Sequence, residues 1–343
     1  MSGKRQHFIP QFLLRGFSSR ESKEVFTWLY RKSNVPFETN IKNVGVEGKF
    51  YTTEQDFSLD DAITNLEPHY AELIGKLREA PSGSISCGKF PEFISHIESR
   101  SRYIRHIFQK PAYYFVDKLA GFLEDENKCM EFFCRKIEKN PEIIRKEVVE
   151  FVKNSHLPDT AVDLVTQLLL HNLRTLLKES PVPFSLFAKM ARENLVKNIL
   201  GAVKNGHISA LKVTTSPEFK QKKYEQFEFS VYEVSGNNLI LGDSMLLFYV
   251  RSQKRFMPFW DQDNLVNAVV LPISSKKLLI GCERDFSVDV SDINSAVAAC
   301  SLEFFVGNRL AQNLKELQSM ISTAPVPFSE KNIDEILREK FDE

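Results

Sequence analysis

The fold is decided by a stretch near the start of the chain, Gln6-His7-Phe8-Ile9-Pro10-Gln11-Phe12-Leu13-Leu14-Arg15-Gly16-Phe17. Chain termini are usually polar and frayed, but this stretch is mostly apolar. Pro10 fixes its own φ and suits a helix start, while Gly16 can adopt the left-handed conformation that ends a helix. We therefore expect about two turns of helix between Pro10 and Arg15, buried against a later sheet, with His7 and Arg15 at its two ends.

Length and composition describe a globular protein that does not span a membrane. Of its 343 residues, 43% are hydrophobic and 26% charged, and the uncharged runs are too short to cross a bilayer. The 45 acidic and 45 basic residues balance, which argues against broad electrostatic adhesion to nucleic acid or to an anionic membrane. Phenylalanine occurs 28 times, so we expect a core rich in aromatic side chains.

The cysteines and the first residues indicate a reducing compartment. The start of the chain lacks the long apolar segment of a secretory signal. The five cysteines are an odd number without the spacing of a disulfide framework, and no zinc-ligand pattern surrounds Cys129 and Cys134. We therefore expect free thiols and a cytoplasmic location.

The order of patterns predicts an α+β fold with three regions. Region 1–80 combines the opening motif with a small antiparallel sheet and a helix of 3.6-residue period that begins near Ser58. Region 85–205 shows helical patterns punctuated by prolines and predicts a helical bundle. Region 206–343 predicts a second antiparallel sheet, starting with a strand at 208–213, and C-terminal helices. We expect the three regions to form one compact unit.

Several elements carry a resemblance to a known family. They are the opening His7-x-x-Pro10 with Arg15 and Phe17, then Phe50-Tyr51, the Leu66-Glu67 helix, the Arg100/Arg102 helix, and the later segments 239–244 and 271–274. In this order they resemble DUF4238, a bacterial family of unknown function, over nearly the whole chain. The resemblance implies architecture more than activity. The family's late turn typically has the sequence Ser-Asp-Asn-Pro, whereas this chain keeps only the aspartate, in Gly242-Asp243-Ser244-Met245.

Four side chains are candidates for a functional site. His7 titrates near neutrality and can act as a general base, a proton donor or a metal ligand, or can simply bond a carbonyl group. Arg15 can clamp a phosphate or carboxylate, or can form a structural ion pair with Glu47 or Glu67. Asp243 can bind Mg²⁺ or accept a proton, or can stabilise its own turn. We expect the four candidates to converge on one cleft: His7, Arg15, Glu67 and Asp243.

A basic helix is a second candidate surface. Its cations are Arg100, Arg102, Arg105 and Lys110, and tyrosines are interleaved with them, as in proteins that bind single-stranded nucleic acid. A solvated helix face explains the same pattern, because charged residues normally lie outside.

The motifs that are missing narrow the function. The sequence has no glycine-rich phosphate loop, no dinucleotide-binding fingerprint, no His-Glu-x-x-His and no Gly-x-Ser-x-Gly. The available residues suit phosphodiester cleavage, in which Glu67 and Asp243 hold Mg²⁺ or Mn²⁺. His7 would transfer a proton, and Arg15 would stabilise the developing charge. We hypothesise a metal-dependent nuclease, used in bacterial defence. The alternatives are a non-catalytic protein that binds a ligand or partner, and a structural adaptor.

Overall fold

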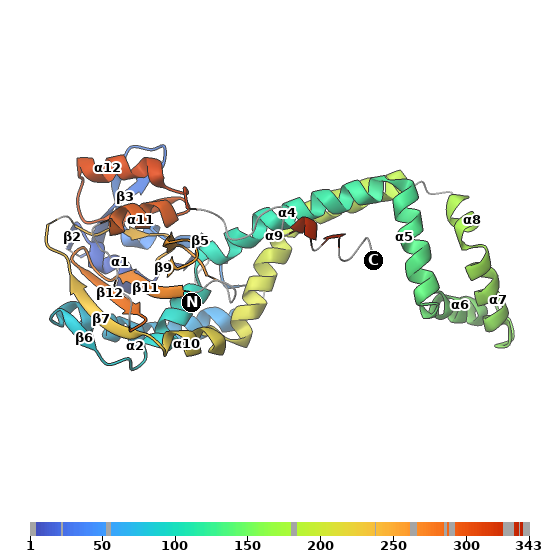
Figure 1. The fold of residues 1–343 in the computed structure, drawn as a ribbon, viewed down its shortest axis with the longest axis horizontal. Helices are drawn as coiled ribbons and strands as arrows, with labels where there is room; N and C mark the ends of the chain where they lie inside the picture. The colour runs from blue at the N-terminus through green and yellow to red at the C-terminus, as the bar shows by residue number, and fades with distance from the viewer. Residues whose placement is uncertain are drawn as a thin grey trace. The chain divides into compact units, whose positions relative to one another are not determined.

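The computed structural model describes residues 5–21, 23–52, 56–179, 184–236, 238–260, 266–284, 287, 292–324, 333–335 and 337–338. The chain divides into two compact units (Figure 1). Unit 1 comprises residues 1–108 and 203–327, and unit 2 comprises residues 109–202 and 328–343. Unit 1 thus joins the first and last regions expected from the sequence, and the middle region supplies most of unit 2.

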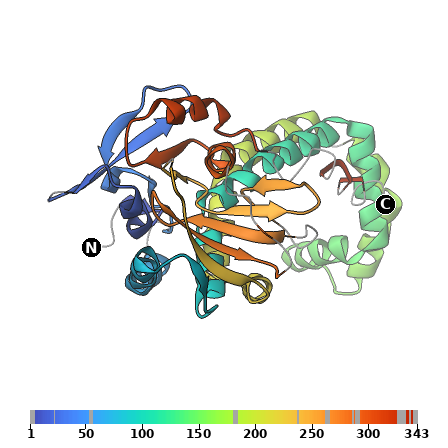
Figure 2. The ribbon, with the colours of Figure 1, turned by 60° about the vertical axis from the view of Figure 1, so that its left-hand side comes forward.

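Unit 1 is an α+β fold with antiparallel sheets, as the sequence predicted (Figure 2). One sheet has six strands, in this order across the sheet: β10 (Arg255–Met257), β9 (Leu247–Val250), β11 (Val266–Pro272), β12 (Lys277–Cys282), β7 (Glu228–Glu233) and β6 (Gly83–Ile85). The central strand β11 is buried along its whole length. Its sequence is therefore a nearly continuous apolar run, rather than the alternation of a strand with one solvent-exposed face.

A second sheet unites strands from the two ends of the chain. Its order is β2 (Arg20–Glu21), β3 (Val25–Arg31), β13 (Phe304–Gly307) and β8 (Leu241–Gly242), and β4 (Phe37–Asn40) also pairs with β3. Tyr30 stacks on Phe305 across β3 and β13, with ring centroids 5.0 Å apart. The N-terminal strands thus form a small antiparallel sheet, which β13 and β8 from the C-terminal part of the chain complete. Only β1 (Arg5–His7) and β5 (Val46–Gly48) pair apart from the larger sheets within the described residues.

Helices complete unit 1. They are α1 (Gln11–Leu14), η1 (Arg15–Phe17), η2 (Ile41–Asn43), α2 (Ser58–Glu79), α3 (Phe90–Ser99), α10 (Glu218–Tyr224), α11 (Ile293–Cys300), α12 (Gln312–Leu317) and η3 (Gln318–Met320). Helix α2 buries its predicted apolar face, including Ile63, Tyr70 and Ile74, in the main core. The strand expected at 208–213 is wrong, because these residues end helix α9 (Phe184–Val213). Ile208 and Leu211 are buried three positions apart, which is helical spacing.

The opening stretch is buried in unit 1, as predicted. Helix α1 and η1 place Phe12, Leu13 and Phe17 in the core. Arg78 on α2 donates hydrogen bonds to the carbonyl groups of Phe12 and Ile273, so it ties α1 to the turn between β11 and β12. The predicted burial is therefore confirmed, and the stretch contacts the later sheet at the β11–β12 turn.

Gly16 has a different structural role from the helix-ending one expected. Its φ is not among the positive values in the chain, so it does not end the helix in a left-handed conformation. Instead, its carbonyl accepts a 2.8 Å hydrogen bond from the Ser275 amide, and a Cβ atom at Gly16 would overlap the carbonyl oxygen of Ile273. Glycine is needed here because two backbones approach closely.

Unit 2 is helical, as the sequence predicted for this region. Its helices are part of α4 (Arg102–Glu124), α5 (Glu126–Lys139), α6 (Glu142–Asn154), α7 (Ala161–His171), α8 (Leu173–Lys178) and part of α9. Helices α6 and α7 pack through Val148, Val152 and Val162. Among the described residues, none of the chain's helices is long and apolar enough to cross a membrane.

Candidate functional site

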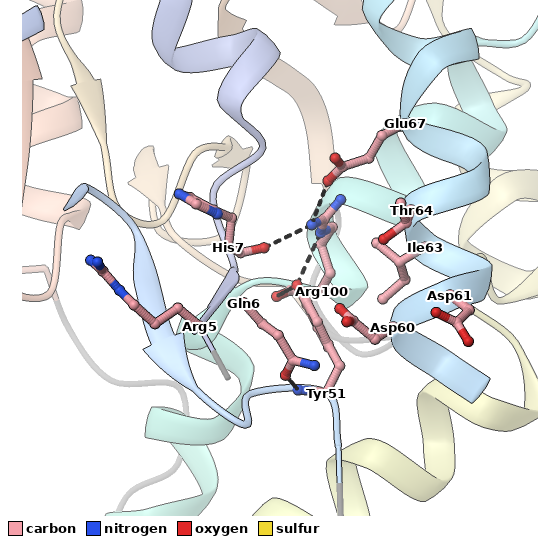
Figure 3. Close-up of a pocket in the computed structure, with 10 residues that line it drawn as sticks. All are labelled: Arg5, Gln6, His7, Tyr51, Asp60, Asp61, Ile63, Thr64, Glu67 and Arg100. Carbon is pink, nitrogen blue, oxygen red and sulfur yellow. Dashed lines mark hydrogen bonds and ion pairs between the residues drawn. The ribbon is translucent and has the colours of Figure 1, made fainter. Parts of the chain in front are cut away.

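Arg100 is the centre of a buried hydrogen-bond network in unit 1. It follows α3, and its side chain is 1% exposed. The guanidinium donates to the Tyr51 hydroxyl at 3.0 Å, to the His7 carbonyl at 2.8 Å and to the Glu67 carboxylate at 3.0 Å (Figure 3). His96 Nε2 lies 3.5 Å from its Nη1. One arginine thus holds together β1, the segment after β5, α2 and α3.

The network makes Arg100 a structural charge with little capacity left for a ligand. A buried guanidinium is stable only if its donors are paired, since an unpaired buried charge costs several kcal/mol. Tyr51 also approaches the Arg100 carbonyl with its hydroxyl at 3.4 Å. Burial acts to lower the pKa of Arg100, but Tyr51 and Glu67 outweigh burial and the pKa is raised. Arg100 therefore stays charged at any physiological pH.

A polar cavity of about 300 Å³ lies beside this network. Figure 3 shows its walls, which are Arg5, Gln6, His7, Tyr51, Asp60, Asp61, Ile63, Thr64, Glu67 and Arg100. The side chains of Asp60, Thr64 and Glu67 line one side because residues four and seven positions apart share a face of α2. Strand β1 supplies the other side. The cavity is thus built between the first strand and the first turns of a rigid helix.

Three carboxylates face this cavity in different electrostatic states. Glu67 is neutralised locally by its ion pair with Arg100. Burial raises the pKa of Asp60, and the nearby Gln6 side chain partly opposes this change. Asp61 is exposed. Gln6 is itself held in place, because its Oε1 accepts a 2.6 Å hydrogen bond from the Tyr51 amide.

His7 contributes mainly through its backbone. Its carbonyl points at Arg100, whereas its ring points away from Arg100 and Glu67 (Figure 3). Burial lowers the pKa of His7, and the charge of Glu67 and a hydrogen bond to the Lys42 main chain partly oppose the change. Its Nε2 is buried and has no hydrogen-bond partner among the described residues. The neutral ring is therefore the form that the fold favours at pH 7.

His96 is a second neutral histidine beside the arginine. Burial, and then the charge of Arg100, lower its pKa to about 3. A guanidinium can only donate, so Nε2 of His96 must be the accepting nitrogen and Nδ1 must carry the proton. Nδ1 is buried and has no partner among the described residues.

Asp243 does not line this cavity. It lies after β8 and is 1% exposed, and its carboxylate accepts hydrogen bonds from the amides of Leu302, Glu303 and Phe304 at 2.6, 2.8 and 3.3 Å. Burial raises its pKa to about 6, although the three amides oppose this change. The carboxylate therefore anchors the segment that enters β13, rather than its own turn. Arg15 is exposed and does not line the cavity either.

Of the four residues expected in one cleft, the structure thus brings His7 and Glu67 together. Within the described part of the chain, no group of three or more histidine, cysteine, aspartate or glutamate side chains could hold a metal ion. The Glu67–Asp243 pair expected to bind Mg²⁺ or Mn²⁺ has Asp243 committed to backbone amides.

The basic helix is not a solvated row of cations. Arg105 is 4% exposed, stacks on the Phe50 ring at 3.6 Å, and donates to His207 Nδ1 at 2.9 Å and to the Phe50 carbonyl. Burial lowers its pKa to about 10. Arg100 is buried as well, so neither arginine can contact a nucleic acid. Arg102 is partly exposed and pairs with Glu303 at 2.8 Å. The side chain of Lys110 lies outside the described residues.

Sequence reasoning missed Gln6, Tyr51, Asp60 and His96 as parts of the site. Tyr51 was visible only as a piece of the family resemblance, whereas Arg100 was also named among the cations of the basic helix. Gln6 adjoins His7, but nothing in its neighbourhood indicates that its amide would hold the Tyr51 backbone. A polar residue acquires such a role from partners that are distant in sequence.

The fold and the site define an α+β protein with a polar cavity built beside a buried arginine. The chain belongs to DUF4238, a family described as proteins of unknown function, whose sequence pattern matches residues 5–318. Neither a curated protein nor a solved structure matches the chain. The elements that carry the family resemblance include His7, Tyr51, Glu67 and Arg100, which meet in the Arg100 network.

Proposed function

We propose that this protein binds a small polar molecule in the cavity between β1 and α2, and that the ligand presents a cationic amino or guanidino group. The observation that carries the proposal is the division of charge around the cavity. Two arginines line the cavity: Arg100 uses its donors on the protein, and Arg5 donates to Asn43. Asp60 and Asp61 leave acceptor oxygens for a ligand. A carboxylate and a guanidinium or ammonium group form charge-assisted hydrogen bonds, which are stronger than neutral ones.

The size of the cavity agrees with such a ligand. Small-molecule sites typically measure about 300 to 1,000 Å³, and this cavity lies at the lower end. Its walls come from a strand and a helix joined by the Arg100 network, so little conformational entropy is lost on binding. Preorganised walls of this kind favour a site rather than a passive gap.

Thermal shift and calorimetry with amines, guanidines and amino acids test the proposal. A ligand at 100 times its Kd stabilises the folded state by about 2.7 kcal/mol, which a melting experiment detects. Asp60→Asn with Asp61→Asn should abolish the shift. The matched control is Glu72→Gln, on the same helix but outside the cavity. If no cationic compound shifts the melting temperature, or if the double variant responds as wild type does, the proposal is wrong.

The phosphodiesterase hypothesis stays a prediction, as does a role in bacterial defence. It is less well supported by the geometry, because Asp243 and Arg100 are committed to the fold. Incubation of the purified protein with RNA and with single- and double-stranded DNA, in Mg²⁺, Mn²⁺ or chelator, tests it directly. Metal-dependent cleavage that is lost in His7→Ala would favour the enzyme over the binding protein.

A further inference from the structure

Unit 1 contains a second cavity, of about 590 Å³, that the proposed function does not use. The β9–β10 hairpin, one face of α11 and the segment 320–324 form its walls. It shares no lining residue with the cavity beside Arg100. Its volume falls within the range of about 300 to 1,000 Å³ that is typical of small-molecule sites.

Short side chains leave this cavity open. Helix α11 contributes Ala296 and Ala299, which share a helix face because they lie three positions apart. The Ala324 amide donates a 3.0 Å hydrogen bond to the Ala299 carbonyl, and the Cys300 thiol contacts the Phe256 carbonyl at 3.7 Å. These bonds join α11 to the other two walls, so a ligand would meet a preformed space and lose little conformational entropy on binding.

One wall of the cavity is aromatic. Tyr249 on β9 lies directly opposite Phe256 on β10, and their rings pack edge to face with centroids 5.5 Å apart. Both side chains are partly buried and line the cavity. Aromatic side chains of this kind bind flat rings by stacking or by edge-to-face contact.

Two cations lie beside the aromatic wall. Lys254 and Arg255 are exposed and line the cavity. Arg255 donates to the side-chain oxygen of Gln253 at 3.0 Å, but neither cation forms an ion pair within the described residues. Arg251 on the same hairpin differs, because it pairs with Glu283 at 3.4 Å and does not line the cavity. The hairpin thus directs its two unpaired cations to the cavity.

The balance of charge favours an anionic ligand. Asp292, which precedes α11, is the one carboxylate among the described residues that line the cavity. Two cations therefore stand against one acid, and the net positive charge attracts an anion. Lysine and arginine both form charge-assisted hydrogen bonds with phosphate and carboxylate oxygens. Asp292 can accept a hydrogen bond from a hydroxyl or amino group of the same ligand.

We propose that this cavity binds a small molecule in which a flat ring carries an anionic group, as in a nucleotide or an aromatic carboxylate. The ring packs against Phe256 and Tyr249 and over the alanines of α11. The anionic group lies against Lys254 and Arg255. The proposal does not depend on the cation-binding function, since the two cavities have no residue in common.

Calorimetric titration of the full chain tests the proposal with four probes. Adenosine monophosphate and indole-3-acetate each join a ring to an anion, whereas adenosine lacks the anion and inorganic phosphate lacks the ring. At least one of the two ring-bearing anions should bind with a Kd below about 1 mM, and the one that binds identifies the source. Adenosine and phosphate should bind at least about tenfold more weakly. Failure of both ring-bearing anions to bind, or equal affinity for adenosine or phosphate, would overturn the proposal.

Charge substitutions locate the bound anion. Lys254→Gln combined with Arg255→Gln should raise the Kd of the bound probe by about tenfold or more, because both charged donors are lost. Arg251→Gln combined with Arg284→Gln is the matched control, since it removes two positive charges outside the cavity. The control should change the Kd by less than about twofold, as expected of screened surface charges. Equal effects of the two double variants would overturn the proposal.

Two further variants separate this cavity from the one beside Arg100. Ala299→Leu places a larger side chain in the floor and should weaken binding without any change of charge. Asp60→Asn combined with Asp61→Asn should leave the Kd unchanged, because these residues line the other cavity. Circular dichroism should show unchanged helix content in every variant that is compared. Binding that survives Ala299→Leu unchanged in a folded protein, or that is lost in the Asp60 and Asp61 variant, would place the ligand elsewhere and overturn the proposal.

Discussion

Replacement of Arg100 by methionine should destabilise unit 1 by about 3 kcal/mol, because methionine fills part of the space but donates no hydrogen bond. The substitution would leave the His7 carbonyl and the Tyr51 hydroxyl without this donor, and each buried group that loses its partner costs about 1 to 3 kcal/mol. It would also leave the Glu67 carboxylate without its ion pair to Arg100. That carboxylate is 31% exposed, so water can hydrate it and its share of the loss is small.

Urea unfolding monitored by tryptophan fluorescence is the appropriate assay for Arg100→Met. Both tryptophans, Trp28 and Trp260, lie in unit 1, so their signal follows this unit and not the helices of unit 2. Arg102→Met is the matched control. Its side chain is 32% exposed and its partner Glu303 is 51% exposed, so the change should cost no more than about 1 kcal/mol.

Equal losses for Arg100→Met and Arg102→Met would refute the reasoning, since burial and pairing would then not distinguish the two arginines. Arg100→Lys separates charge from geometry. A lysine keeps the charge but lacks the planar fork, so it cannot serve Tyr51, His7 and Glu67 together. We expect Arg100→Lys to lower the free energy of unfolding by most of the amount that Arg100→Met does. Full retention would show that charge alone suffices.

Three further outcomes are expected. The free energy of unfolding should fall as the pH drops from about 6.5 towards 4, because His96 stays neutral in the fold while the unfolded chain takes up the proton. His96→Gln should reduce the slope of this pH profile by up to about 1.4 kcal/mol per pH unit. The control His69→Gln, at an exposed position, should leave the slope unchanged. Gly16→Ala should cost about 1 to 3 kcal/mol through overlap with the neighbouring backbone, whereas Gly75→Ala, in open space on α2, should stabilise by about 0.5 to 1 kcal/mol. All five cysteines should react as thiols in the denatured protein purified without oxidant.

Each of these outcomes can fail in a specific way. The raised pKa of Asp243 acts in the opposite direction to the histidines, because the fold then holds a proton between about pH 4 and 6 that the unfolded chain releases. The test is therefore the difference in pH dependence between His96→Gln and wild type, and equal slopes for the two proteins would contradict the role of His96. If Gly16→Ala melted at the wild-type temperature, the close approach would be wrong. Fewer than five reactive thiols would indicate a disulfide.

The sequence predicted the local elements where periodicity and burial agree. Helix α2 and the helices of unit 2 show apolar residues at helical spacing, which needs no information from elsewhere in the chain. The burial of the opening stretch could also be predicted from the sequence, because exposing so many apolar side chains to water is unfavourable. The segment 208–213 failed because a short apolar run suits a strand and a helix end equally well.

The sequence by itself determined that the protein is α+β, that the apolar side chains of its opening stretch are buried and that its middle is helical. Only the tertiary structure decided which charges are buried. Arg100 and Arg105 look like any cations on a basic helix, yet the fold surrounds them with Tyr51, Glu67 and Phe50. Periodicity reports which face of an element is apolar, whereas the burial of a charge depends on partners that distant segments bring to it. The cavity beside Arg100 therefore could not be predicted from the sequence.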